Sequence, residues 1–442
     1  MNTPIYDFVK TYANKNKSRF HMPGHKGTSL LGPEYLDITE IDGADVLSET
    51  KGIIGESEQN ATSLFGSAHT FYTTQGSTIS VCAMLALVES KRNRPLIWAA
   101  RNVHKAFIHA AALLDLDVKF IMPEDFTSII KCEISPSHLQ KDLENTSEKP
   151  DAIYLTSPDY LGNMQDIKGI AYVCKSFDIP LLVDNAHGAY LKFLPESLHP
   201  LDAGATACCD SAHKTLPVLT GGAYLHISKS APASYVQNAR KKLALFSSTS
   251  PSYLIMQSLD LCNAYLEDTF RKELFDCLQK VAALKQELLY KGFVLSGNEP
   301  LKITLDALKS GYTGEEIANC LKKHQIEPEF YDNDFLTLMI SPQNNNLDFE
   351  RLQKAFETIQ LKKPIIRKQL TLSAPQAVCS IREAVFAKSE KIAVESAQNK
   401  ICASLTVSCP PAVPIAVCGE QITTEHIKLF KHYKITEIEV IK

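Results

Sequence analysis

One lysine lies in a stretch of small, hydroxyl and imidazole side chains that could carry out covalent chemistry. Lys214 belongs to the run Asp210-Ser211-Ala212-His213-Lys214-Thr215-Leu216-Pro217. Apolar residues precede this run at 205–209 and follow it at 223–227, a pattern that indicates a turn between two buried strands. A lysine in such a turn differs from a solvated surface lysine, and its amine can form a Schiff base with a carbonyl.

A carboxylate follows an earlier apolar run. Residues 180–183 predict a strand, and Asp184-Asn185-Ala186-His187-Gly188 comes directly after it. Pyridoxal phosphate (PLP) needs a lysine to hold its aldehyde and an acidic side chain to keep its ring nitrogen protonated, so that the ring can act as an electron sink. Lys214 and Asp184 could supply these two groups.

A third element adds a site for phosphate. Gly76, Ser77 and Thr78 precede the apolar-periodic segment 79–87, which predicts a helix. Small residues and hydroxyls at a helix start form an anion site, because free N–H groups and the helix dipole face the anion. A lone lysine near serine and histidine is structural in most proteins, and a Gly-Ser-Thr run alone is weak evidence. The three elements together predict a PLP enzyme.

Several motifs resemble those of the ornithine/lysine/arginine decarboxylase family, which has the aspartate-aminotransferase-type fold. The resemblance is carried by 211–217 (SAHKTLP), 183–189 (VDNAHGA), 21–27 (HMPGHKG), 39–43 (TEIDG) and 101–105 (RNVHK). It runs from near residue 1 to the region of 410–411. The chain resembles a short member that lacks the N-terminal receiver-like domain of the long bacterial forms.

The resemblance implies roles for single residues. His104 would stack on the PLP ring, His187 would lie at the ring edge beside Asp184, and Ser211 and His213 would help to bind phosphate. The implied catalytic residues are Lys214, His104, Asp184 and His213. The implied cofactor-binding residues are Gly76, Ser77, Thr78, His104, Asp184, His187, Ser211, His213 and Lys214.

The segments that must position these residues alternate between strand and helix from about 60 to 260. Helices are expected there at 103–114 and at 166–177, the second capped by Asp166, and a further helix is expected beyond them at 314–323. This alternation predicts an α/β fold with a mainly parallel central sheet, in which ligands lie beyond the carboxyl ends of the strands. The resemblance makes it the PLP-dependent transferase fold of type I. We expect an N-terminal arm at 1–55, a PLP-binding large domain at 56–290, a small α+β domain at 291–363 and a C-terminal decarboxylase module at 364–442. Within that module, 409–414 is expected to be extended.

The resemblance also implies a substrate and an assembly. A basic amino acid (lysine, arginine or ornithine) would lose CO₂ and give an amine, as in polyamine biosynthesis. Glu40, Asp42 and Asp45 form an acidic cluster that could receive its distal cation, although composition alone favours a solvated turn. The hydroxyl-rich segment 247–251 would reach the phosphate of a neighbouring subunit. A homodimer or higher homo-oligomer with its active site at the subunit interface is therefore expected.

Composition narrows the other possibilities. The 442 residues carry a net charge of −4, so the sequence lacks the excess of basic residues that is typical of nucleic-acid-binding proteins. Neither an apolar run long enough to span a bilayer nor a signal peptide is found, so a cytoplasmic protein is expected. The 12 cysteines form no metal-binding spacing and are expected to be buried and reduced; no metal is predicted.

Three alternatives stay open. The same scaffold could catalyse transamination or elimination, because fold does not fix reaction. The chain could bind PLP without turnover, or be a structural protein without a cofactor. Three residues depart from the family pattern: Ala412 replaces the usual glycine, Cys418 the usual proline, and Asn185 stands where an acidic residue is commoner. These departures bear on substrate fit and dimer packing more than on the cofactor groups.

Overall fold

The computed structural model describes residues 1–124, 126–367, 370–404 and 412–442. The chain divides into two compact units: Met1–Val88 with Cys174–Glu273, and Glu89–Val173 with Leu274–Lys442. Of the segment expected to be extended at 409–414, residues 409–411 lie outside the described residues.

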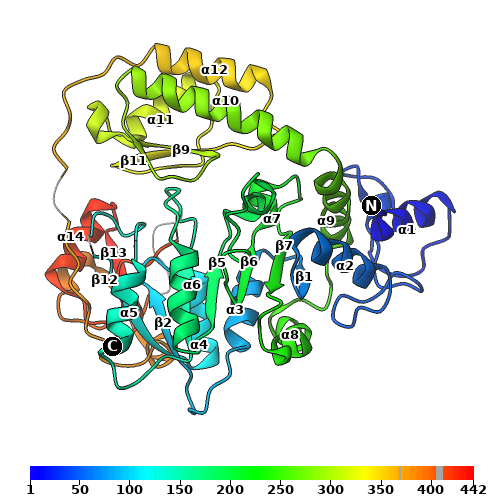
Figure 1. Cartoon of the computed structure of the whole chain (residues 1–442), viewed down its shortest axis with the longest axis horizontal. Coiled ribbons are helices and arrows are strands. Elements are labelled where there is room, and N and C mark those ends of the chain that lie inside the picture. Colours follow the sequence, from blue (N-terminus) through cyan, green and yellow to red (C-terminus); the bar gives the residue numbers. More distant parts are fainter. Residues whose placement is uncertain (125, 368–369, 405–411) are drawn as a thin grey trace. The chain divides into compact units, whose positions relative to one another are not determined.

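The first unit contains four strands of the large domain (Figure 1), namely β1 (His69–Thr73), β5 (Leu181–Asp184), β6 (Ala207–Asp210) and β7 (Ala223–Ile227). They lie in the order β1-β7-β6-β5. β5 and β6 are parallel, whereas β7 is antiparallel to both of its neighbours. β5, β6 and β7 are buried along their whole length, as strands covered on both faces must be.

Helices accompany these strands. They are α1 (Pro4–Asn14), α2 (Ile53–Phe65), α3 (Ser77–Ala86), α7 (Ala212–Thr215), α8 (Ala233–Phe246) and α9 (Tyr253–Asp268), with 3-10 turns at Glu34–Leu36 and Ala189–Phe193. α3 packs on β6, β7 and α8, and its residues 79–85 are all buried. A helix that is apolar on every side has to lie inside a protein, so the sequence of α3 determines its central place.

The second unit contains three parallel strands in the order β4-β2-β3. These are β2 (Leu96–Ala100), β3 (Asp117–Ile121) and β4 (Ala152–Thr156), and their helices are α4 (Lys105–Leu114), α5 (Pro136–Glu144) and α6 (Ile167–Ser176). Asp166 accepts a hydrogen bond from the backbone N–H of Gly169 at 2.9 Å, which confirms the predicted cap of α6.

The same unit holds a smaller antiparallel sheet in the order β10-β11-β9-β8. Its strands are β8 (Leu295–Ser296), β9 (Lys302–Asp306), β10 (Phe330–Tyr331) and β11 (Phe335–Met339). The helices that accompany them are α10 (Phe270–Tyr290), α11 (Gly314–Lys323) and α12 (Asn346–Glu357), with a 3-10 turn at Leu308–Ser310. The first residues of α10 belong to the first unit. Capping boxes begin α11 at Thr313 and α12 at Asn345.

The C-terminal part pairs β12 (Ser389–Ala393) with β13 (Glu437–Ile441) and adds α13 (Ile381–Phe386), α14 (Thr424–His432) and a 3-10 turn at Val394–Ser396. Ala412 has a φ of 60°, in the left-handed region that favours glycine. The alanine therefore occupies a backbone conformation that explains why the family usually has glycine there. The thiol of Cys418 donates a hydrogen bond to the carbonyl oxygen of Ser404 at 3.0 Å.

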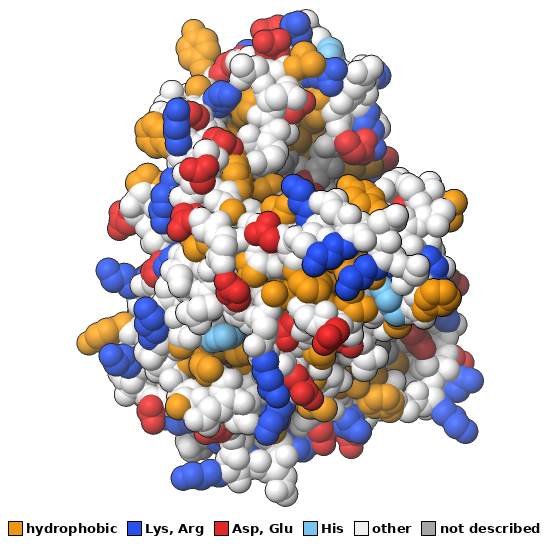
Figure 2. Space-filling view, turned by 90° about the vertical axis from the view of Figure 1, so that its right-hand side faces the viewer, with side chains coloured by type: hydrophobic (Ala, Val, Ile, Leu, Met, Phe, Trp, Pro, Cys, Tyr) orange, Lys and Arg blue, Asp and Glu red, His pale blue; other side chains and the backbone are white. Residues whose placement is uncertain are grey.

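The predicted fold class is confirmed: α/β with mainly parallel pairing, a smaller α+β part and a C-terminal module. The helix predicted from Val103 begins instead at Lys105, because the side chain of His104 caps it. Among the elements that were not predicted are β1, β8, β10, β12, β13, α2, α5, α8 and α14. The four domain boundaries stay predictions. None of the helices among the described residues is long and apolar enough to cross a membrane. On the face in Figure 2, acidic and basic side chains are interspersed.

Candidate active site

Lys214 lies on the one-turn helix α7, which begins directly after β6. Ser211 precedes that helix, and its carbonyl oxygen accepts a hydrogen bond from the backbone N–H of Lys214 at 3.0 Å. The Lys214 Nζ is 3.1 Å from the Nε2 of His187. The amine is therefore within hydrogen-bond distance of an imidazole that comes from the neighbouring loop, as parallel β5 and β6 bring their carboxyl ends to one edge.

Asp184 is the last residue of β5 and is 4% exposed. Its Oδ1 accepts hydrogen bonds from the backbone N–H of Ala186 at 3.1 Å and from the thiol of Cys209 at 3.6 Å. Burial and the charge of Asp184 both raise the pKa of that thiol. His187, next after Ala186, is 5% exposed. A buried carboxylate at this position is suited to hold a cationic ring nitrogen.

Ser77 and Thr78 are the first two residues of α3, and Gly76 precedes them. The Ser211 hydroxyl donates to the Ser77 Oγ at 2.8 Å, so the α7 loop and the start of α3 are joined by side chains. Gly76 has a φ of 76°, and nothing lies within 4 Å of the point where a Cβ would be. This open space at a helix N-terminus could receive a phosphate.

His213 is unsuited to the role of a charged acid. Its Nδ1 donates a hydrogen bond to the carbonyl oxygen of Gly222 at 2.9 Å. Burial lowers the pKa of His213, and the charge of Lys214 lowers it further, against the effect of the Gly222 carbonyl. At neutral pH this imidazole is therefore uncharged.

His104 belongs to the second unit. It is the N-cap of α4, and its Nδ1 accepts a hydrogen bond from the backbone N–H of Ala106 at 3.1 Å. In the neutral ring the proton then lies on Nε2, and the cap fixes the ring orientation. The loop before it is tied to the C-terminal part: Arg101 contacts Glu420, and the Lys105 N–H donates to Ala412.

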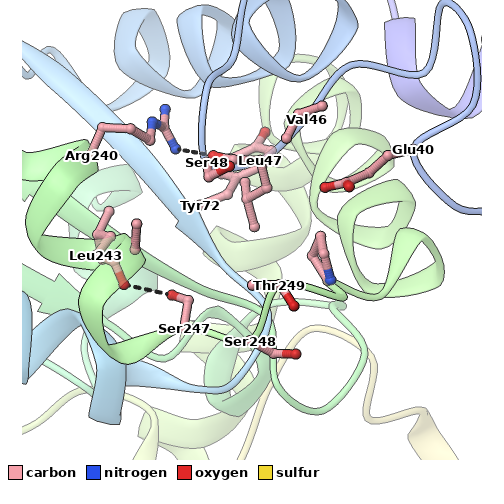
Figure 3. Close-up of a pocket in the computed structure, with 12 residues that line it drawn as sticks. Glu40, Val46, Leu47, Ser48, Tyr72, Arg240, Leu243, Ser247, Ser248 and Thr249 are labelled. Atoms are coloured by element: carbon pink, nitrogen blue, oxygen red, sulfur yellow. Dashed lines mark hydrogen bonds between the residues drawn. The ribbon is translucent and has the colours of Figure 1, made fainter.

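A cavity of about 160 Å³ lies in the first unit beside the hydroxyl-rich segment 247–251. Figure 3 shows the Glu40 carboxylate and the Thr249 hydroxyl in its wall. The backbone N–H of Ser248 donates to the Oε1 of Gln75 at 2.8 Å, next to Gly76 in the chain. The predicted hydroxyl segment is thus adjacent to the start of α3 of its own chain.

Asp45 and Glu40 of the acidic cluster differ in what their carboxylates contact. Asp45 accepts backbone hydrogen bonds from residues 46, 51, 52, 54 and 55, and thereby holds the entry to α2. Burial raises the pKa of Asp45, but these N–H groups lower it more, so that it lies below its ordinary value. Glu40, in contrast, lines the cavity. Of these two, Glu40 is thus the better candidate for binding a cation.

Two buried groups received no role from the sequence. Asp210 accepts hydrogen bonds from Asn185, His199 and His226, and Arg101 binds Glu420 in the second unit. A charged residue directly after an apolar run was the only available signal, and it does not identify the partner. The partners come from distant parts of the chain.

Comparisons with known proteins agree with the geometry. The family model of the Orn/Lys/Arg decarboxylase major domain matches residues 3–306, and that of the C-terminal domain matches 360–438. The chain is 30% identical to the uncharacterized protein YaaO of Bacillus subtilis, over 97% of this chain and 93% of that protein. It is 29% identical to an arginine decarboxylase of the same organism, again over 97% and 93%.

Solved structures show the same fold. The constitutive lysine decarboxylase of E. coli superposes with a TM-score of 0.78 at 16% identity, over 100% of this chain and 82% of that one. Lysine decarboxylase A of Pseudomonas aeruginosa gives 0.79 at 15% identity, over 99% and 80%. An alanine–glyoxylate aminotransferase of Nostoc sp. covers 69% of this chain with a TM-score of 0.55. The chain therefore belongs to the Orn/Lys/Arg decarboxylase family.

Proposed function

We propose that the protein is a PLP-dependent decarboxylase of a basic amino acid: lysine, arginine or ornithine. The observation that carries the proposal is the amine of Lys214 at 3.1 Å from the His187 imidazole, which lies in the loop that begins with the buried Asp184. Family membership and relatives that are named arginine decarboxylase support it.

The residues present fit PLP on three counts. Lys214 offers an amine for the aldehyde, and Asp184 offers a buried carboxylate for the ring nitrogen. Gly76 leaves open space at the start of α3, where Ser77 and Ser211 place hydroxyl groups for the phosphate. When bound, PLP supplies an electron sink that stabilises the electron pair left behind by CO₂.

The residues of this chain have separate tasks. His187 can accept a proton from the Lys214 ammonium at 3.1 Å, which leaves the neutral amine as a nucleophile. Asp184 would accept a hydrogen bond from the ring nitrogen of bound PLP and thereby keep that nitrogen protonated. His104 provides a planar face whose orientation the α4 cap fixes.

The proton returned to the substrate carbon comes from Lys214 or His104 in this proposal. His213 is a poor proton donor, because its Nδ1–H is hydrogen-bonded to the carbonyl oxygen of Gly222 and its lowered pKa keeps the ring neutral. Its fixed ring instead positions the lysine that follows it in the chain.

We further propose that Glu40 binds the distal cation of the substrate. Its carboxylate lines the cavity with the hydroxyls of Ser48 and Thr249, whereas the nearby Arg240 is already paired with Glu58. We also propose a homodimer in the cytoplasm, with segment 247–251 completing the site of its partner and the amine product serving polyamine biosynthesis.

The experiment uses the purified protein with added PLP. A visible absorbance band that borohydride fixes onto Lys214, located by peptide mapping, is expected, with CO₂ released from lysine, arginine or ornithine. Lys214→Ala should lose both, and Asp184→Ala should lose about 3 kcal/mol or more of transition-state stabilisation. Keto-acid formation without CO₂ would favour transamination, and a band without any turnover would favour a non-catalytic PLP binder. A label on another lysine would refute the assignment.

A further inference from the structure

A fully buried hydrogen-bond network lies behind the loop that carries Asp184 and His187. Its centre is Asp210, which immediately precedes Ser211 and is 0% exposed, as are Asn185, His199 and His226. The Asp210 Oδ2 accepts from the Nε2 of His199 at 3.0 Å and from the Nε2 of His226 at 3.1 Å. Its Oδ1 accepts from the Asn185 Nδ2 at 2.6 Å.

Both histidines donate a hydrogen bond to Asp210. The Nδ1 of His199 accepts the Leu201 N–H at 3.4 Å, which places the ring proton on Nε2, and burial lowers the pKa of His226. Burial raises the pKa of Asp210, but the two histidines beside it lower the pKa more, so the carboxyl is ionised. The network thus directs three donors at the carboxylate of Asp210.

The charged network controls the path of the loop. The backbone N–H of Asn185 donates to Cys209 at 3.0 Å, and the Gly188 N–H donates to the Asn185 carbonyl at 2.8 Å. A Cβ on Gly188 would lie 2.0 Å from the Asn185 Oδ1, so the amide packs against this glycine, and any side chain there would displace it. Asn185 is therefore held through both backbone and side chain, and its chain neighbours are Asp184 and Ala186, with His187 next.

We propose that Asp210 is a positioning residue for Asp184 and His187, and that positions 185 and 210 can hold one carboxylate between them, at either position, but not two. This inference rests on the proposed PLP function. With Asn185→Asp and Asp210→Asn together, the new amide oxygen at position 210 would accept from both histidines, and the NH₂ of that amide would donate to the carboxylate at position 185. Every donor would keep its acceptor, and only the position of the charge would change.

The same argument predicts a severe effect of one single substitution. Asn185→Asp alone would set two buried carboxylates at a contact that is now 2.6 Å, and one of them would have to take up a proton. Asp210→Asn alone would remove the charge but leave hydrogen bonds, because the Asn185 amide can turn. A mild effect is expected there.

The cluster also resembles a metal site, since ligand atoms of His199, Cys208 and Asp210 lie within 4.8 Å of one another. Burial raises the pKa of Cys208 well above its ordinary value, so its thiol stays protonated. The Nε2 atoms of both histidines are already at hydrogen-bond distances from Asp210. A hydrogen-bond network explains the cluster without an ion.

The test is a cycle of wild type, Asn185→Asp, Asp210→Asn and the double variant. Three quantities are measured: the Kd for PLP from the visible band, the pH dependence of that band, and the urea midpoint of the cofactor-free protein. Asn185→Asp should weaken PLP binding about 10-fold or more and shift the pH dependence. The double variant should return both to within about threefold of wild type. Asn344→Asp, which adds a carboxylate beside Asp348 far along the chain, is the control and should leave PLP binding unchanged.

Two results would overturn the inference. One is a double variant no better than Asn185→Asp in PLP binding. The other is a change in the urea midpoint alone, with the Kd and the pH dependence of the band unmoved, which would make the network merely structural. Failure of the proposed function looks different, because then wild type itself forms no band on Lys214.

Discussion

Replacing Arg101 by methionine should destabilise the second unit strongly. The guanidinium donates to the carbonyl oxygens of Pro414 at 3.1 Å and Ile415 at 2.8 Å, and to the Glu420 Oε2 at 3.2 Å. Arg101 is 3% exposed and Glu420 is 4% exposed. Methionine fills similar space, but it leaves a buried carboxylate without its cation and two carbonyls without donors.

The size of the effect follows from that burial. Removing one partner of a buried ion pair costs about 3–5 kcal/mol, because the remaining charge stays in a medium of low polarity. Burial already raises the pKa of Glu420, while Arg101 lowers it, so loss of Arg101 should raise that pKa further. Glu420→Gln in the same protein should recover part of the loss, because a neutral amide can still accept the Val417 N–H.

The assay can use the only tryptophan of the chain. Trp98 is buried in β2, three residues before Arg101, so its fluorescence in urea reports unfolding of this region. Arg382→Met is a matched control: Arg382 also donates to two backbone carbonyls, at 3.0 and 3.2 Å, but it is exposed. Its loss should cost less than about 1 kcal/mol. Equal effects of the two substitutions would refute the reasoning.

Two further predictions concern the C-terminal part. Burial lowers the pKa of His426 from 6.5 to about 4, and the charge of Arg101 contributes to the same shift. Between these two pH values the unfolded chain therefore binds more protons than the folded chain. The free energy of unfolding should fall as the pH drops from 6.5 to 4. His426→Asn should remove about 2 kcal/mol of that acid loss between pH 7 and pH 4.5, measured as urea midpoints at these two values; an unchanged pH dependence would contradict it. Ala412→Gly should stabilise the protein by about 0.5–1 kcal/mol, because it relieves a left-handed backbone; a lower melting temperature would show that the alanine methyl contributes more than the strain.

Much of the fold could be predicted from the sequence, because its signals are local. The buried strands β2, β4, β5 and β7 are short apolar runs, and α11 was predicted with the bounds it has. β1 was missed because apolar and polar side chains do not alternate clearly in His69-Thr70-Phe71-Tyr72-Thr73. The start of α4 was wrong by two residues, because a histidine cap is rarer than a serine, threonine or aspartate cap.

The candidate site was predictable in its residue types but not in its contacts. Lys214, Asp184 and Ser77 were proposed because each follows a predicted strand or begins a helix. The acidic cluster illustrates the limit: composition treats Asp45 and Glu40 alike. Only the folded chain shows that the backbone N–H groups before α2 use the carboxylate of Asp45, while Glu40 lines the cavity.

The sequence by itself determined the strand–helix alternation, the residues that follow each strand, and the family. Tertiary structure alone decided which of those residues meet. The 3.1 Å contact of Lys214 with His187, and the convergence of His199, His226 and Asn185 on Asp210, join segments that are distant in the chain. Periodicity reports which face of an element is buried, but hydrogen bonds between elements depend on how those faces pack, and that information is not local.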